Sequence, residues 1–404
     1  MRSLSATLEA ELAALAATDR LRACPEIAGT SRVDVVVGQH PRISFCSNDY
    51  LGLASHPALR SAAAAAAARD GFGASASRLV SGDLPAHRQL EMHLATFLGC
   101  QAALVFPTGY QANLGVLTAL AGSEDLIVSD ALNHASIIDG CRLSRARVAI
   151  YPHADASAAA RLLAGPGRFR RRLLVTESLF SMDGDIAPLG ALAEAATATD
   201  AILIVDEAHA FGTLGPGGRG LCAAAGVVPD VLVATLGKAL GAAGGFIAGD
   251  RALRDILVNL SRTFIYTTAL PPPVAAAADA ALDLAAGPEG ERRRGLLHQH
   301  RVWLDDQLGA LGVGGPAWAT VTGPTDPTSR STSPIRGPIV PILIGGNARA
   351  LAVSAALAAR GIFAPAIRPP TVPAGSARLR ITLSAAHDAA DLKALVAALG
   401  EALE

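Results

Sequence analysis

Lysine is almost absent from this chain. Of its 34 basic residues 32 are arginine, and the two lysines are Lys238 and Lys393. The 35 acidic residues bring the net charge to −1, and no long basic run occurs, so a nucleic-acid partner is not expected. Lys238 stands in an apolar, glycine-rich stretch. An amine can form a Schiff base and a guanidinium cannot, which makes this lysine a candidate for chemistry. The alternative is an ordinary surface lysine.

Cysteine is also scarce, and long uncharged apolar runs are missing. The five cysteines are odd in number and lack CxxC spacing, which favours free thiols in a reducing compartment. Glu9 and Glu11 stand where a signal peptide would have its apolar core, so we expect a cytoplasmic protein. Residues 231–249 are apolar enough to suggest a membrane span. Lys238 near their centre and five glycines argue against it, and we expect no membrane partner.

Three short motifs are misleading in this context. Residues 215–220 spell GxGxxG, but they do not link a strand directly to a helix, so a dinucleotide site is not expected. Residues 206–209 spell the DEAH of a helicase, but the only Gly-Lys pair, at 237–238, is followed by alanine where a phosphate loop needs Ser or Thr. His298 and His300 have no nearby acidic or thiol partner, so no metal site is predicted.

The length and composition indicate two domains of an α/β enzyme. Hydrophobic residues make up 51% of the 404 residues and charged residues 17%. This balance favours one large, well-buried domain and a smaller one. We predict an N-terminal arm with a helix and a hairpin over 1–55, a large α/β domain over 56–285, and a smaller α+β domain over 286–404. Residues 312–338 are rich in Gly, Pro, Ser and Thr and predict a long surface loop.

Strand and helix patterns alternate through the large domain, so its sheet should be mostly parallel and flanked by helices. The expected strands are 102–106, 126–129, 148–151, 173–176, 201–205, 231–234 and a shorter one at 245–248. Leucines at near-helical spacing over 4–21 predict an amphipathic opening helix, followed by a hairpin of 33–37 and 42–46. The C-terminal domain should contain strands 339–344 and 379–383 and helices 348–360 and 388–403.

Polar side chains follow two of these strands. Asp206 and His209 come after one apolar run, and Thr235 and Lys238 come after the next. Open α/β sheets bind ligands at the carboxyl ends of their strands. We therefore expect an acid, an imidazole, a hydroxyl and an amine to meet one ligand.

A helix start near Gly109 suggests an anion site at the same edge. It follows a strand and a Thr-Gly pair, and both free N–H groups and the helix dipole at such a start favour an anion. The signal is not specific alone, because many strand-to-helix turns contain Thr-Gly. His134 and Ser181 fall just after two further strands and should lie near the same edge.

With these residues placed, the sequence resembles the α-oxoamine synthases, which are pyridoxal 5′-phosphate (PLP) enzymes of the aspartate aminotransferase fold. The resemblance covers about residues 20–399. It rests on SNDYLG at 47–52, TESLFSMDGD at 176–185, DEAH at 206–209, TLGK at 235–238, IRPPTVP at 367–373 and RLR at 378–380. It implies a PLP-dependent transferase of fold type I, with a mostly parallel central sheet flanked by helices and a smaller α+β C-terminal domain.

The resemblance also implies the catalytic residues, which are Lys238, His134 and Asp206. Lys238 would bind PLP as a Schiff base and then act as the base at the substrate Cα. Asp206 would pair with the ring nitrogen and keep it protonated, which makes the ring an electron sink. His209 and Ser181 would hydrogen-bond the ring 3′-oxygen. His134 would stack on the ring and contact the substrate.

Phosphate binding and a homodimer are implied in the same way. Gly109, Tyr110 and Thr235 match positions that bind the phosphate region. In the family's dimers the partner subunit adds a hydroxyl to the site, and Thr267 matches the residue that supplies it.

The substrates follow from the branch of the family that the 367–373 run resembles. That branch is an acyltransferase of biotin biosynthesis, which condenses L-alanine with pimeloyl-CoA or pimeloyl-acyl-carrier protein. Asn48 and Arg380 would hold the amino-acid carboxylate, and Arg22 and Thr371 would contact the acyl substrate. One alternative is a glycine-using member such as glycine C-acetyltransferase. Another is a non-catalytic binding or regulatory protein of the same fold.

The sequence departs from the family pattern at three places. Ser178 stands where glycine is commoner, residues 74–77 replace a more glycine-rich loop, and 312–338 is longer than usual. These changes concern loop mobility and thioester contacts more than the cofactor chemistry.

Overall fold

A seven-stranded sheet is the centre of one of the two units into which internal contacts divide the chain. The computed structural model describes residues 4–29, 33–313 and 335–404. The large unit consists of 48–296 with 335–337, and the small unit of 4–29, 33–47, 297–313 and 338–404. The three-part division expected from the sequence stays a prediction, and in the present grouping the N-terminal and C-terminal segments share one unit.

The large sheet has the strand order β4-β10-β9-β8-β7-β5-β6. Its strands are β4 (Ala102–Phe106), β5 (Leu126–Asp130), β6 (Arg147–Tyr151), β7 (Arg172–Glu177), β8 (Ile202–Asp206), β9 (Val231–Thr235) and β10 (Gly245–Gly249). Strands β5 to β9 pair in parallel, and β10 is antiparallel to both β4 and β9. This confirms the predicted mostly parallel sheet.

The reversal of β10 has a simple cause. Only residues 236–244 link β9 to β10, which is too short for the helical crossover that a parallel pair needs. The chain therefore turns back at once, and Lys238 lies in that turn.

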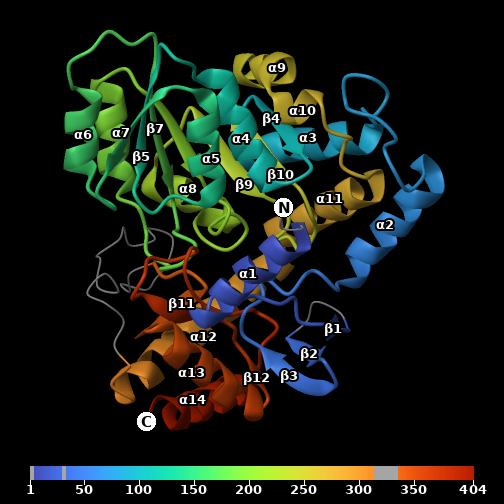
Figure 1. Cartoon of the computed structure of the whole chain (residues 1–404). Coiled ribbons are helices and arrows are strands. Elements are labelled where there is room, and N and C mark those ends of the chain that lie inside the picture. The colour runs from blue at the N-terminus through green and yellow to red at the C-terminus, as the bar shows by residue number, and fades with distance from the viewer. Residues whose placement is uncertain (1–3, 30–32, 314–334) are drawn as a thin grey trace. The chain divides into compact units, whose positions relative to one another are not determined.

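Helices cover both faces of this sheet (Figure 1). The helices of the large unit are α2 (Pro57–Asp70), α3 (Pro85–Leu98), α4 (Gly109–Leu120), α5 (Ala135–Ser144), α6 (Ala156–Leu163), α7 (Leu189–Ala198), α8 (Leu221–Ala225), α9 (Arg251–Leu260), α10 (Arg262–Ile265) and α11 (Pro272–Ala286), with a 3₁₀ turn at Pro216–Gly218. The next helix, α12 (Pro288–Ala310), contains the boundary between the units.

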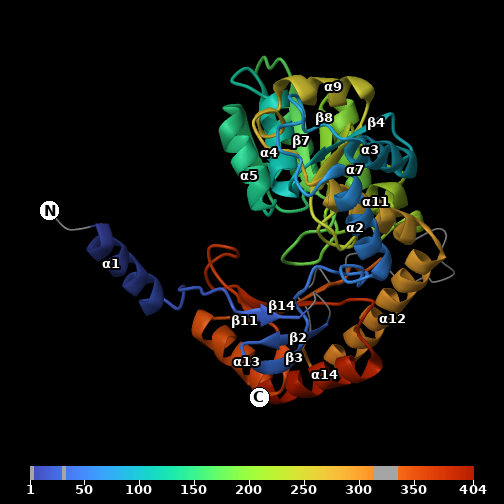
Figure 2. The ribbon, with the colours of Figure 1, turned by 90° about the vertical axis from the view of Figure 1, so that its right-hand side faces the viewer.

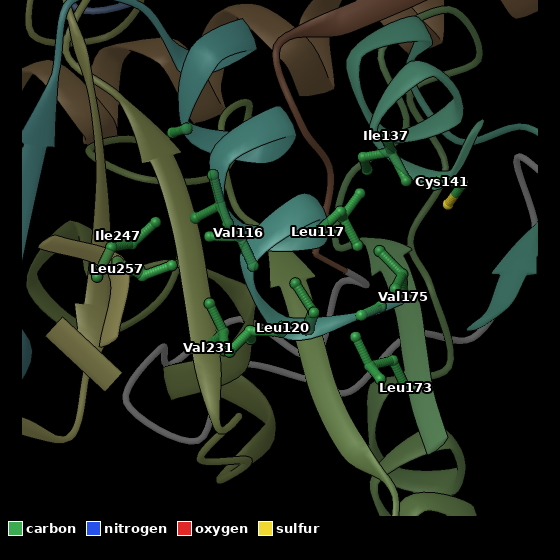
Figure 3. Close-up of a cluster of buried hydrophobic side chains, with 14 of the residues drawn as sticks. Val116, Leu117, Leu120, Ile137, Cys141, Leu173, Val175, Val231, Ile247 and Leu257 are labelled. Atoms are coloured by element: carbon green, nitrogen blue, oxygen red, sulfur yellow. The ribbon is translucent and has the colours of Figure 1, made fainter. Parts of the chain in front are cut away.

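The core of the large unit fixes α4 on the sheet. Val116, Leu117 and Leu120 of α4 belong to a buried apolar cluster that also includes residues of β7, β9 and β10 (Figure 3). Burying one such side chain contributes about 1.5–3 kcal/mol. Packing therefore holds the start of α4 in place beside the carboxyl ends of the strands.

The small unit contains two short sheets. One has the order β1-β2-β3-β12, built from Ile27–Ala28, Asp34–Val37, His40–Ser44 and Ile362–Phe363. The other has the order β11-β14-β13, built from Ile339–Gly345, Ala377–Thr382 and Ala366–Ile367. The antiparallel β2/β3 pair is the predicted hairpin. Helices α13 (Asn347–Ala359) and α14 (Ala389–Leu403) lie beside these strands (Figure 2).

The opening helix is shorter than predicted, and most of the predicted 312–338 loop lies outside the described residues. Helix α1 is Leu4–Ala17 and ends before residue 21, because Asp19 adopts a left-handed backbone with φ of 53°. None of its residues is buried, and Leu4, Leu8 and Leu12 of the apolar face that the leucine spacing predicted are exposed. Of the loop expected over 312–338, residues 314–334 lie outside the described part of the chain. No helix in that described part is both long and apolar enough to cross a bilayer.

Candidate active site

The predicted polar residues meet in one cavity at the carboxyl ends of the parallel strands. Its volume is about 160 Å³. The predicted site residues that line it are Gly109, Tyr110, His134, Asp206, His209, Thr235 and Lys238. A larger cavity of about 980 Å³ lies near Asp230, at the opposite end of β9, and no lysine lines it. Among the described residues, no cluster of His, Cys, Asp and Glu is arranged to hold a metal.

Lys238 begins a chain of hydrogen bonds that runs back to Asn48. Its Nζ lies 2.8 Å from His209 Nε2, and His209 Nδ1 lies 2.7 Å from the hydroxyl of Tyr50. Tyr50 donates its single proton to Asn48 Oδ1 at 3.1 Å. His209 Nδ1 must therefore be the donor to Tyr50, so Nε2 is the acceptor and Lys238 donates. The hydrogen bond to His209 thus orients the amine of Lys238, which is half-buried.

Asp206 is the last residue of β8 and is only 6% exposed. Its Oδ2 accepts from Asn113 Nδ2 at 2.7 Å, and its Oδ1 accepts from the backbone N–H of Ala208 at 2.8 Å. A buried carboxylate with neutral partners is suited to bind a cationic group such as a protonated ring nitrogen.

The start of α4 is built as an anion site. Thr108 caps the helix by accepting from the backbone N–H of Gln111 at 3.1 Å, and the first N–H groups of a helix have no partner within it. Thr235 donates its hydroxyl to the carbonyl of Gly244 at 2.8 Å and accepts from the N–H of Gly237 at 3.1 Å. Its side chain therefore also holds the turn that carries Lys238.

Gly245 must be glycine for this arrangement. A Cβ on Gly245 would lie 2.4 Å from the Cα of Gly109, where backbone meets backbone. We expect Gly245→Ala to lower the free energy of unfolding by about 1–3 kcal/mol, as overpacking does. Gly190→Ala is the matched control, because a Cβ there meets nothing within 4 Å. Thermal unfolding of both variants measures the difference, and equal melting temperatures would contradict the steric argument.

His134 and Tyr110 lie side by side at the cavity. His134 caps α5, and its Nδ1 lies 2.8 Å from the hydroxyl of Ser136. Its ring packs edge-on against Tyr110, with centroids 6.3 Å apart. The Tyr110 hydroxyl donates to Asp139. The exposed His134 ring is thus free to contact a flat ligand.

Ser181 lies in a loop that a half-buried histidine anchors. His153 bonds Asp130 through Nδ1 at 2.9 Å and Asp185 through Nε2 at 2.6 Å, and its ring meets Phe180 edge-on. This joins the end of β5 to the loop that follows β7. Ser178, the residue that departs from the family pattern, donates its hydroxyl to the buried Glu207 at 2.7 Å.

The contacts of His153 with Asp130 and Asp185 make the free energy of unfolding depend on pH. Burial alone would lower the pKa of His153, but its hydrogen bonds and charge interactions with Asp130 and Asp185 raise it to about 10. In the unfolded chain a histidine pKa is about 6.5. The anchor's contribution is therefore complete below about pH 6.5 and is lost as the pH rises towards about 10. We expect His153→Gln to be less stable than wild type at neutral pH, with the gap narrowing towards pH 10 in denaturant titrations. A gap independent of pH would contradict this.

The remaining predicted residues lie outside the cavity lining. Thr267 accepts from Gln111 Nε2 at 3.3 Å. Arg22 donates to the carbonyl of Pro369 at 3.0 Å, Thr371 is exposed, and Arg380 is buried on β14. These three belong to the small unit, so their predicted contacts with substrate stay predictions.

Sequence reasoning missed four residues of the site. Tyr50, Asn113, Ser136 and Glu177 were given no role, although Tyr50 and Glu177 stand inside the motifs at 47–52 and 176–185. For Tyr50 and Glu177 the signal was membership of a motif, and for Asn113 and Ser136 there was none. Tyr50 is 159 residues from His209.

Comparison with known proteins decides the family. The model of class I and II aminotransferases matches residues 41–399. The chain belongs to this family. Among its aminotransferase-family relatives, the 8-amino-7-oxononanoate synthase of Anaeromyxobacter dehalogenans is 49% identical, over 98% of this chain and 94% of that protein. The enzyme of the same name from Herminiimonas arsenicoxydans is 47% identical, over 97% and 98%.

Solved structures of this family agree with the fold. A serine palmitoyltransferase from S. paucimobilis, with PLP and myriocin bound, superposes with a TM-score of 0.88 at 29% identity, over 99% of this chain and 98% of that chain. The 8-amino-7-oxononanoate synthase of Francisella tularensis superposes with a TM-score of 0.74 at 28% identity, over 90% and 98%. These matches confirm the predicted family and the PLP-dependent fold type I.

Proposed function

We propose that this chain catalyses the PLP-dependent, decarboxylative condensation of L-alanine with a pimeloyl thioester. The products are 8-amino-7-oxononanoate, CO2 and the free thiol, and the reaction belongs to biotin biosynthesis. The observation that carries the proposal is the cavity in which Lys238, His209 and Asp206 meet beside a capped helix start. The nearly full-length relatives named 8-amino-7-oxononanoate synthase support the choice of substrates.

The residues of the cavity fit PLP. An amine, a buried carboxylate and a helix start with free N–H groups match its aldehyde, its ring nitrogen and its phosphate. When bound, PLP supplies an electron sink for the electron pair that remains on the amino-acid Cα after a proton leaves. Lys238 would hold the cofactor covalently, and Asp206 would bind the protonated ring nitrogen.

Lys238 also has the position for proton transfer. Its Nζ would take the Cα proton of L-alanine and later return one to the product. The hydrogen bond to His209, at 2.8 Å, orients that nitrogen. Tyr50 fixes the tautomer of His209, so this chain of hydrogen bonds keeps the Lys238 nitrogen oriented for proton transfer.

The other contacts belong to the proposal as well. Asn48 and Arg380 would bind the alanine carboxylate, and Arg22 and Thr371 the acyl donor, which is pimeloyl-CoA or pimeloyl-acyl-carrier protein. In a homodimer Thr267 would complete the partner's phosphate site. The free cysteines suit a cytoplasmic location.

A direct assay tests the substrates. The purified protein with PLP, L-alanine and pimeloyl-CoA should give a product with the mass of 8-amino-7-oxononanoate, and glycine in place of L-alanine should give little turnover. Faster turnover with glycine and a short acyl-CoA would move the chain to the glycine-using branch. Cofactor binding without turnover of either amino acid would favour a binding protein.

A further inference from the structure

Glu177 is the second carboxyl group that lines the active-site cavity, beside Asp206. It lies within the motif at 176–185, but the proposed function gives it no role. It is the last residue of β7, and it is paired in register with Asp206 at the end of β8. It lines the same cavity as Lys238 and is 2% exposed. The parallel pairing places the two carboxyl side chains on the same face of the sheet, and both line the same cavity.

One oxygen of Glu177 has no hydrogen-bond partner among the described residues. This atom is the buried Oε1, while backbone N–H groups of His134 and Ser181 face the carboxyl group. A buried polar atom left unpaired costs about 1–3 kcal/mol. Such an atom inside a binding cavity is explained if a ligand supplies the missing hydrogen bond.

A neighbouring glutamate shows the contrast. Glu207 is equally buried, but both of its oxygens are occupied. Oε2 accepts from Ser178 at 2.7 Å and from the N–H of Leu221 at 3.1 Å, and Oε1 accepts from the N–H of Cys222 at 2.6 Å. Glu207 thus has a structural role, whereas one oxygen of Glu177 is available to a molecule bound in the cavity.

The charges of the cavity decide which carboxyl group carries a proton. Asp206 accepts hydrogen bonds from Asn113 and from the N–H of Ala208. Burial raises the pKa of Glu177 well above its usual range and the charge of Asp206 raises it further, whereas Lys238 and the backbone N–H groups of His134 and Ser181 only partly offset this. Two adjacent buried carboxylates do not both ionise beside one amine.

We propose that Glu177 holds a proton and donates a hydrogen bond from Oε1 to an oxygen of the molecule bound in this cavity. This inference rests on the proposed function, which supplies two such oxygens. One is the 3′-oxygen attached to the PLP ring, and the other is a carboxylate oxygen of L-alanine.

Three variants test the donor. Glu177→Gln keeps a neutral donor of the same shape, Glu177→Leu removes it, and Glu207→Gln is a control at a buried glutamate that does not face the cavity. PLP affinity is measured from the visible absorbance of the bound cofactor, and L-alanine affinity from the change of that spectrum in the PLP-loaded protein. Loss of a hydrogen bond to a charged oxygen should weaken the affected ligand about tenfold to a hundredfold in Glu177→Leu.

The pattern of losses assigns the oxygen. Weaker PLP binding in Glu177→Leu identifies the 3′-oxygen of PLP as the acceptor. Weaker L-alanine binding alone identifies the carboxylate of L-alanine. In both cases Glu177→Gln should bind like wild type, and Glu207→Gln should lower only the melting temperature. Wild-type affinities in a folded Glu177→Leu would overturn the inference, and so would equal losses in the Gln and Leu variants, because an anion would then be the active form.

Infrared spectroscopy provides a second readout that does not need the Leu variant to fold. The wild-type protein at neutral pH should show a protonated-carboxyl band that Glu177→Gln lacks, and its absence would overturn the inference. This band is read with or without PLP. A failure of the proposed function is seen separately, as a wild-type protein that binds no PLP.

Discussion

Lys238→Ala is expected to lower turnover on the order of 10⁴-fold, because one amine would serve both as the covalent attachment point and as the base. The expectation rests on geometry. Nζ lies 2.8 Å from His209 in a cavity that also contains Asp206 and the start of α4. Steady-state assays with L-alanine and pimeloyl-CoA measure the effect, and kcat should fall more than the affinity for either substrate.

The composition of the chain provides the control. Lys393 is the only other lysine, and it lies exposed on α14. Lys393→Ala should turn over like wild type. Lys238→Arg keeps the positive charge but cannot form a Schiff base, so it should be as inactive as the alanine variant. Near-normal activity in either Lys238 variant would rule out the proposed chemistry.

Asp206→Asn is expected to lower kcat by about 10²–10³-fold, the usual effect of removing one preorganised electrostatic contact. The change would remove the charge that is proposed to keep the ring nitrogen of PLP protonated, and with it most of the electron-withdrawing power of the ring. It also sets an amide against the Asn113 amide, which now donates to Asp206 at 2.7 Å. Some loss of stability is therefore expected in addition to the loss of activity.

Exchanging the two side chains separates these effects. The double variant Asn113→Asp/Asp206→Asn restores a carboxylate and an amide to the pair, so its melting temperature should recover towards wild type. Its activity should stay low, because the carboxylate then stands on α4 instead of at the end of β8. Recovery of activity with stability would mean that the position of the charge is unimportant, which contradicts the role given to Asp206.

The sequence was most informative where local rules decide the structure. The strand before Asp206 and the strand before Thr235 are continuous apolar runs, and such runs become buried strands. Placing Asp206, His209 and Lys238 at one edge of the sheet then needed only the rule that ligands bind at the carboxyl ends of parallel strands. The helix start near Gly109 was predictable for the same reason, since its cap is formed within residues 108–111.

Long-range pairing limited the rest. Whether Tyr50 meets His209, or Asn113 meets Asp206, depends on how distant segments pack, and no local pattern contains that information. The free oxygen of Glu177 is visible only once every neighbour is placed. The opening helix is a further example. Its leucine spacing correctly predicted a helix, but it did not indicate whether other residues would cover the apolar side chains.

Trapping the cofactor on the protein tests the central claim most directly. The wild-type protein is loaded with PLP, reduced with borohydride, digested, and mapped by mass spectrometry. Borohydride converts a Schiff base into a stable amine, so the added mass stays on the lysine that formed it. We predict that the mass is found on the peptide containing Lys238 and not on the one containing Lys393. A label on Lys393 alone, or no label on either lysine, would contradict the account.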